Sequence, residues 1–409
     1  MFGSLPKNFS QTDAAKKTFL FDNCRCFCSG IVEAAFKAFA LIIAIRFFNA
    51  SKTAKSLISS AGFLGYFVAI VTQSIAAKQR RFKTMDLAKM YLLIVAILIF
   101  MAALVSSLGA FMALMVAAMI FFKQPVPLME DVYGQNYSPN ERGSRLAFAL
   151  MVLPLSTAIF SAIGGKSLDL HLKNYRPIFA IVALAAVGSA VSFSKIPSRL
   201  LPAQKKKSVL SNFKIIFQDK LFGKILLWWS FAGIANQMVN PLRTEYLVNR
   251  DYGINASNLF ETFACLIIPL SFRIVSTLSW GRLFDRSKII TVKLLVNSFM
   301  VIGFLLFFHT KAKWVISFAA IFAGIAWGGG EIVWCLWVTK IVPKESLSMY
   351  MGVNVAIVGL RGFLAPFIGY GLSHYFTLQQ VSWIATSMVL VSSIGLFTLR
   401  KYPRFDRIK

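Results

Sequence analysis

The sequence has few cysteines, few histidines and few acidic residues. Its 409 residues include 5 Cys, 3 His and 16 Asp or Glu, against 44 Lys or Arg. Five cysteines do not form a disulfide framework. The phosphate-cradling pattern G-x-x-x-x-G-K-[ST] is absent, which argues against ATP hydrolysis by this chain. No catalytic constellation is visible, so the sequence does not predict an enzyme.

Metal sites and cofactors are not expected either. His171, His309 and His374 share no ligand spacing. The segment CRCFC at 24–28 could hold a soft metal, but it lacks further clustered ligands, and reduced thiols are the favoured interpretation.

Apolar residues, in contrast, are abundant. The chain is 57% hydrophobic and 14% aromatic, above the roughly 45–50% apolar content of soluble domains. Runs of about 20 apolar residues, long enough to cross a bilayer, recur along its length. The first 27 residues show no secretory signal, and the first apolar run is expected to stay as a spanning helix. Twelve spans are predicted, at about 28–48, 56–77, 87–106, 110–132, 146–165, 177–194, 222–246, 258–280, 289–309, 314–339, 349–374 and 378–399.

The spans divide into two sets of six. The predicted organisation is a tail (1–27), a first bundle (28–194), a basic linker (195–221), a second bundle (222–400) and a tail (401–409). Most Lys and Arg fall on the side of the termini and the linker, which predicts that these are cytoplasmic. The net charge of +28 is thus explained by topology rather than by nucleic-acid binding. We expect a monomer embedded in the lipid bilayer, in the inner (plasma) membrane of a bacterium.

The two halves show weak sequence similarity to each other. Pro139-x-Glu141 follows the fourth span and Pro343-x-Glu345 follows the tenth. These positions are six spans apart, so the repeat runs in parallel, as in one class of transporters.

The segment WGRLFDRSK, at 280–288, adds a local signature. With Gly281, Asp285 and Arg286 in register, it resembles the loop motif G-x-x-x-D-R-x-G-R-[RK] of the major facilitator superfamily. The Gly-Arg that follows in the motif is missing here. The corresponding loop of the first half, TQSIAAKQRRFK, has the basic part of the motif, including Arg80 and Arg81, but neither its Gly nor its Asp. The resemblance implies an all-α fold of twelve transmembrane helices in two pseudo-symmetric six-helix bundles.

The loop motif also suggests a gate. Gly281 would allow close approach of a helix end, and Asp285 beside Arg286 could cap or pair with a helix terminus when the halves rock. An ordinary charged turn that only fixes topology is the alternative interpretation.

Ionisable residues within the spans carry the functional information, because charges at membrane depth usually face a cavity. In the tenth span Glu331 and Trp334 share a helical face with Trp327, beside a GGG run. This arrangement favours contact with a ligand or proton. The alternative is a structural pair between Glu331 and either Arg273 or Arg361.

Polar residues in other spans allow the same two interpretations. Asn236 and Asn240 share a face of the seventh span, and either bind a polar solute or bond between helices. Glu33 and Lys37 are four residues apart and can neutralise each other. Lys123, followed by Gln124, faces the cavity or extends its ammonium towards the cytoplasm.

Together these residues predict a secondary transporter of a small anionic or zwitterionic metabolite, coupled to protons through Glu33 and Glu331. Alternating access follows from the family resemblance. Export of amphipathic compounds and a non-transporting receptor on the same fold are the alternatives. The predicted substrate site comprises Lys37, Lys123, Gln124, Asn236, Asn240, Glu331, Trp334 and Arg361.

Overall fold

The computed structural model describes residues 11–79, 83–200, 213–342 and 346–402. Arg80, Arg81, Pro343 and Glu345, which the sequence analysis singled out, lie outside these ranges. The chain forms two compact units. Unit 1 comprises Met1–Ala50 and Ala61–Lys205, and unit 2 comprises Ser51–Ser60 and Lys206–Lys409. The boundary at 205–206 falls inside the segment 195–221 that the sequence assigns to a linker.

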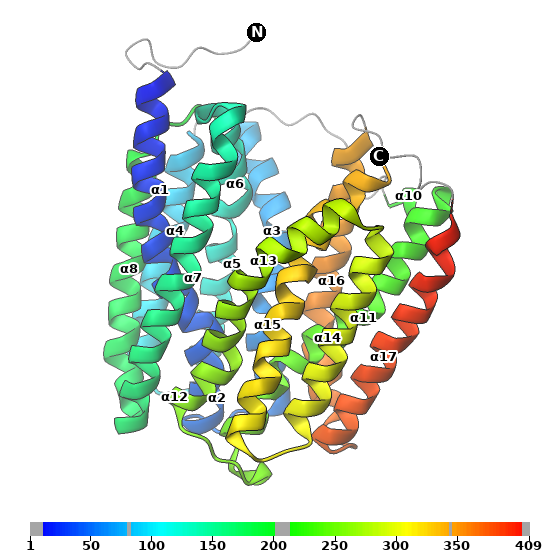
Figure 1. The fold of residues 1–409 in the computed structure, drawn as a ribbon. Coiled ribbons are helices and arrows are strands. Elements are labelled where there is room, and N and C mark those ends of the chain that lie inside the picture. Colours follow the sequence, from blue (N-terminus) through cyan, green and yellow to red (C-terminus); the bar gives the residue numbers. More distant parts are fainter. Residues whose placement is uncertain (1–10, 80–82, 201–212, 343–345, 403–409) are drawn as a thin grey trace. The chain divides into compact units, whose positions relative to one another are not determined.

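Unit 1 is built from helices that follow one another closely in sequence (Figure 1). They are α1 (Gln11–Ala34), a π-helical turn η1 (Ala35–Phe39), α2 (Ala40–Arg46), α3 (Lys52–Gln79), α4 (Thr84–Leu104), α5 (Leu108–Lys123), α6 (Pro125–Asn136), α7 (Pro139–Leu170), the 3-10 turn η2 (Leu172–Asn174) and α8 (Tyr175–Lys195). Within the unit, α1 packs on α7 and α8, and α4 packs on α5 and α8.

The described part of unit 2 is also built from helices. Its elements are α10 (Ile215–Gln218), α11 (Lys220–Val248), η3 (Arg250–Tyr252), α12 (Asn258–Thr262), the π-helical turn η4 (Phe263–Ile267), α13 (Ile268–Arg286), α14 (Ile289–Phe308), α15 (Lys313–Leu336), η5 (Val338–Lys340), α16 (Leu347–Leu372), α17 (Leu378–Thr398) and η7 (Leu399–Lys401). Helix α15 packs between α13 and α14, while α11 packs on α16 and α17. All of these packed helices except α17 line one cavity, described below.

Membrane-spanning length is the common feature of these helices. Ten segments in the described part of the chain are long and apolar enough to cross a bilayer. Two further helices, α3 and α11, have 28 and 29 residues. At 1.5 Å per residue each is about 40 Å long, sufficient to span a membrane. Counting them, the described helices provide the twelve spans that the sequence predicts.

The beginning of α3 belongs to unit 2 although the rest of the helix belongs to unit 1. Lys55 Nζ lies 2.8 Å from Glu245 Oε1, and both side chains are buried. Lys52 Nζ donates to the Ser373 carbonyl at 2.6 Å, and Ser56 Oγ donates to the Pro366 carbonyl at 3.3 Å. These polar contacts explain why Ser51–Ser60 groups with α11 and α16, whereas the sequence assigns it to the first bundle.

Three expected helix boundaries differ from the structure by six residues or more, and one of them is the start of α7, expected at residue 146 but found at Pro139. The first span was expected to begin near residue 28, but α1 already begins at Gln11. Its polar residues misled the prediction because they are satisfied by neighbours: Thr18 Oγ1 accepts from Asn136, and Asp22 accepts from Arg25 and Tyr133. The eighth span was expected to end at 280, but α13 runs to Arg286, so the motif of 280–288 lies largely on a helix.

Candidate functional site

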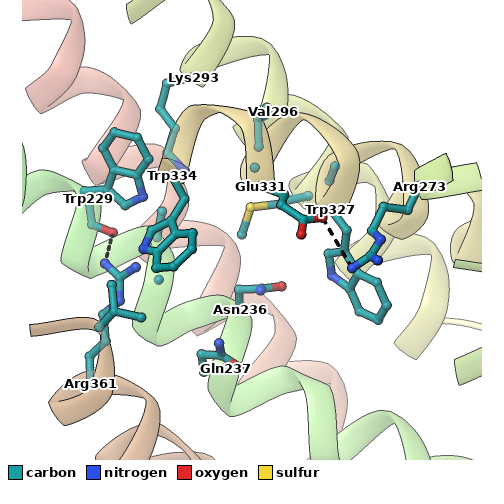
Figure 2. A pocket seen from close by; sticks show the side chains of 16 residues that line it. Trp229, Asn236, Gln237, Arg273, Lys293, Val296, Trp327, Glu331, Trp334 and Arg361 are labelled. Atoms are coloured by element: carbon teal, nitrogen blue, oxygen red, sulfur yellow. Dashed lines mark hydrogen bonds and ion pairs between the residues drawn. The ribbon is translucent and has the colours of Figure 1, made fainter. Parts of the chain in front are cut away.

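Five helices of unit 2, α11, α13, α14, α15 and α16, line a partly open cavity of about 290 Å³ (Figure 2). Its polar side chains project from all five helices. The lining consists of Trp229, Ala232, Gly233, Asn236, Gln237, Arg273, Lys293, Val296, Met300, Ala326, Trp327, Gly330, Glu331, Trp334, Val358 and Arg361. Four residues that the sequence predicts as substrate contacts are therefore brought together here: Asn236, Glu331, Trp334 and Arg361.

The glycine run of α15 brings this helix close to its neighbours. A Cβ on Gly328 would come within 3.0 Å of the Arg273 carbonyl on α13, and one on Gly329 would lie 2.6–2.7 Å from Val296 and Trp280. The helix stays continuous through the run and ends at Leu336. Gly328 and Gly329 thus serve close packing rather than unwinding, and they set Glu331 against α13.

Glu331 is paired with Arg273. Their charged groups approach to 3.3 Å, and the side chains are 52% and 26% exposed, respectively. Of the two partners that the sequence allows for Glu331, the structure therefore selects Arg273 over Arg361. The pair is open to the cavity, so a proton or a charged ligand can reach the carboxylate in this conformation.

Arg361 occupies a different part of the cavity. Its Nη1 donates to the backbone carbonyl of Trp229 at 3.2 Å. Gly233 leaves the space for the guanidinium, because a Cβ there would lie 2.5 Å from Arg361 Cζ. In Figure 2 this contact and the Glu331–Arg273 pair lie on opposite sides of the view, with Trp334 and the amides between them.

Lys293 on α14 is a lining residue that the sequence does not predict. It is only 5% exposed, and its Nζ lies 4.7 Å from the centre of the Trp229 ring. Within the described chain, neither Lys293 nor Arg361 has a carboxylate within 4.0 Å. Because Lys293 is the fifth residue of α14, its sequence position suggests an interfacial lysine, and only the neighbouring helices reveal its burial.

The polar face of α11 contributes amides. Asn236 and Gln237 line the cavity, whereas Asn240 does not; its Nδ2 donates to Gln237 Oε1 at 3.5 Å. Pro241 lies inside α11 and cannot donate a hydrogen bond to the Gln237 carbonyl four residues earlier. The expected weakening of the helix is therefore located next to the cavity. The hydrogen bond from Asn240 helps to orient the Gln237 side chain.

The predicted site residues of unit 1 form a separate cluster. Glu33 Oε1 lies 2.8 Å from Lys37 Nζ and 4.0 Å from Lys123 Nζ. Lys37 belongs to the π-helical turn η1, a local distortion frequent at functional positions. Lys123 also lies over the Phe122 and Tyr66 rings at 5.3 and 5.8 Å. One carboxylate thus serves two ammonium groups in this unit.

Gln124 has a different environment from Lys123. Its Nε2 donates to the carbonyls of Gly65 and Ile120, and its Oε1 accepts from Thr72 Oγ1 at 2.6 Å. The side chain is fully buried. These bonds join α3 to the break between α5 and α6, which favours a structural role.

The motif residues Asp285 and Arg286 lie exposed on the last turn of α13, and a Cβ at Gly281 would meet only Ile332 at 3.9 Å. The contact that fixes this helix end comes from another residue. Lys340 Nζ donates to the Phe284 carbonyl at 2.6 Å and lies 4.2 Å from the centre of the Phe284 ring. A cation at a helix C-terminus is stabilised by the helix dipole.

The CRCFC segment lies within α1. Cys24 is exposed, Cys26 is buried and Cys28 is partly exposed. Cys26 Sγ accepts from Arg25 at 2.9 Å, and Arg25 also pairs with Asp22 at 2.7 Å. In the described part of the chain, no group of three or more His, Cys, Asp or Glu could hold a metal ion.

Comparison with known proteins decides the family. The family model for the Major Facilitator Superfamily matches residues 26–366. The chain belongs to this superfamily. It is accordingly a multi-pass integral membrane protein of a family whose transporters carry small molecules, and its expected fold is confirmed.

Individual relatives are distant. The putative sugar transporter ERD6-like 13 of Arabidopsis thaliana is 24% identical over 176 residues, which make up 42% of this chain and 34% of that protein. The match therefore spans about a third of that relative's length.

Several solved structures share the fold. The nucleoside transporter NupG aligns with a TM-score of 0.75 at 13% identity, covering 95% of this chain and 100% of that one. A peptide transporter POT in complex with sulfate aligns with a TM-score of 0.74 at 13% identity, covering 98% and 99%. A bacterial homologue of the human lysosomal transporter Spinster, in an inward-facing conformation, aligns at 0.62 with 15% identity, covering 97% and 95%.

Proposed function

We propose that this superfamily member is a secondary active transporter of a small anionic or zwitterionic metabolite. The observation that carries the proposal is the charge balance of the unit 2 cavity. Three cationic side chains line it, Arg273, Lys293 and Arg361, against the single carboxylate of Glu331. A cavity with an excess of cations attracts anions and repels cations.

The remaining lining suits a small metabolite with a ring or a flat polar part. Trp229, Trp327 and Trp334 provide apolar surface, and Asn236 and Gln237 provide both donors and acceptors. A volume of about 290 Å³ is at the lower end of ordinary ligand pockets. Likeness to sugar, nucleoside and peptide transporters is consistent with a polar organic solute of this size.

Proton coupling is proposed at Glu331, and in unit 1 at Glu33. Protonation of Glu331 would release Arg273 from its ion pair and so change the charge offered to the solute. Glu33 lies between Lys37 and Lys123, and its protonation would likewise release these two ammonium groups from their ion pairs. Alternation between inward-open and outward-open states would then link these proton transfers to solute movement.

The test begins with a thermal-shift screen of purified protein against a metabolite library at two pH values. Hits are then assayed for uptake into proteoliposomes with an imposed pH gradient. We expect anions or zwitterions to stabilise the protein and to be accumulated. Glu331→Gln should abolish accumulation driven by the gradient but retain solute exchange. Glu141→Gln is the matched control, because Glu141 pairs with Arg145 at the start of α7, outside the cavity.

Three outcomes would contradict the proposal. Stabilisation only by cationic amphiphiles would instead indicate export of such compounds. Binding without flux would indicate a receptor on the same fold. Unchanged gradient-driven uptake in Glu331→Gln would exclude this carboxylate from coupling.

A further inference from the structure

The positive charge of the cavity is not evenly distributed. Arg273 is neutralised by Glu331, whereas Lys293 and Arg361 both contact Trp229, one over its ring and the other at its carbonyl. No acidic side chain of the described residues lies within 4.0 Å of either cation. The Trp229 side of the cavity therefore carries two formal positive charges that the described residues do not balance.

Burial makes these charges costly without a counter-ion. Lys293 is 5% exposed and Arg361 is only half-buried, so the lysine has the poorer access to water. An ammonium group removed from water loses favourable solvation, and a nearby anion offsets that loss. A ligand that brings two negative charges would neutralise both groups, while a ligand with one would leave a net positive charge.

The two side chains also differ in a way that suits an oxyanion. Arg361 donates one hydrogen bond to the Trp229 carbonyl, and its other guanidinium N–H groups can bind a ligand. A guanidinium binds two oxygens of a phosphate or carboxylate at once, whereas an ammonium acts as a compact point charge. The Trp229 carbonyl and the gap at Gly233 fix the guanidinium in place before any ligand arrives.

We propose that Lys293 and Arg361 form a subsite for a doubly charged oxyanion, such as the phosphate of a phosphate monoester. Trp334, which lies beside Arg361 in the lining, would cover the organic part of the same solute (Figure 2). The inference rests on the proposed function in that it takes this cavity as the substrate site. It goes further by assigning the selectivity between one and two negative charges to Lys293 and Arg361.

The test compares phenyl phosphate with phenyl sulfate at pH 8. The two probes have the same ring and a tetrahedral oxyanion, but phenyl phosphate carries two charges because its second pKa is about 6. Binding to the full-length protein in detergent is measured by quenching of tryptophan fluorescence and by isothermal titration calorimetry. We expect phenyl phosphate to bind at least about tenfold more tightly, as the extra charge meets two cations in a partly dry site.

The variants locate this preference. Lys293→Met and Arg361→Gln should each reduce the ratio of the two affinities towards one, whereas Arg145→Gln, which lies outside the cavity, should leave the ratio unchanged. Thermal unfolding of every variant establishes that it is folded, and Lys293→Arg should restore most of the preference if the first variant is unstable.

The outcomes separate this inference from the proposed function. If both probes bind equally and depend on Arg361, the cavity binds anions but does not select their charge, and the subsite proposal is overturned. If Arg273→Gln rather than Lys293→Met removes the preference, the wrong cation has been assigned. If neither probe binds while neutral or cationic solutes do, the proposed function fails together with the subsite.

Discussion

Lys55 on α3 and Glu245 on α11 form an ion pair 2.8 Å long, and their side chains are 7% and 3% exposed. Glu245 Oε1 also accepts from Asn249 at 2.7 Å, and Tyr370 OH lies 3.5 Å from Oε2. Additional hydrogen bonds of this kind are needed to offset the desolvation of a buried pair. The Lys55–Glu245 pair matters for where α3 is held, because it attaches the start of this helix to other helices of unit 2.

Removing one partner of this pair should destabilise the protein strongly. Lys55→Met leaves the Glu245 carboxylate buried without its cation, which costs about 3–5 kcal/mol. We expect a clear fall of Tm in detergent, measured by intrinsic fluorescence. The double variant Lys55→Met/Glu245→Leu removes both charges and should recover much of the loss. A double variant no more stable than Lys55→Met would refute this account.

Gly233→Ala should weaken anion binding through Arg361. The new Cβ would lie 2.5 Å from Arg361 Cζ and would push the guanidinium away from the Trp229 carbonyl. If displacing the guanidinium costs the bound state about 1–3 kcal/mol, the affinity for phenyl sulfate, measured by calorimetry, should fall by about five- to 150-fold. Gly371→Ala is the control, since a Cβ there meets nothing within 4 Å. Equal affinities in the two variants would contradict the assigned position of Arg361.

Alanine substitutions at the adjacent glycines Gly329 and Gly330 of α15 should change stability in opposite directions. Gly329→Ala would place a Cβ 2.6–2.7 Å from Val296 and Trp280, which should cost about 1–3 kcal/mol of stability. Gly330→Ala would meet only Val296 at 3.9 Å and should gain up to about 1 kcal/mol of helix propensity. The two Tm values, compared in one detergent, check this order. A lower Tm for Gly330→Ala would show that α15 packs differently.

Gln124→Leu distinguishes a structural amide from a substrate contact. The change removes the bonds to Gly65, Ile120 and Thr72, and we expect a loss of about 1–3 kcal/mol in stability. Affinity for phenyl sulfate should stay the same in the folded fraction. Gln135→Leu, whose amide bonds to Asp131 on its own helix, should have a smaller effect on Tm. Lost affinity at an unchanged Tm would instead support the role predicted from the sequence.

The spans were predictable because each needs a long apolar run, and that signal is local. Glu331 and Trp334 were identified from helical spacing, and both line the cavity together with Arg361 and Asn236. Charged or amide groups at membrane depth usually have a cavity to face, so depth alone selected them. Asn240, four residues further along α11 than Asn236, does not line the cavity, and its amide bonds to Gln237 on the same helix.

Lys293 and the start of α1 could not be predicted in the same way. Lys293 is the fifth residue of α14, where a lysine normally reaches water, but its ammonium lies over the Trp229 ring of α11, and Arg361 of α16 lines the same cavity. Residues 11–27 appeared too polar for a packed helix, because the partners of Asp22 include Tyr133, more than a hundred residues away. Both errors concern polar groups whose environment is created by tertiary packing.

The division of α3 has a consequence for the autonomy of the two halves. A fragment beginning in the 201–212 segment would contain α11 to α17 but not Ser51–Ser60, so Glu245 would lose its ammonium partner. The C-terminal half should therefore fail to accumulate when it is expressed alone. Co-expression with the N-terminal half as a second polypeptide should rescue it, because that fragment supplies Lys55.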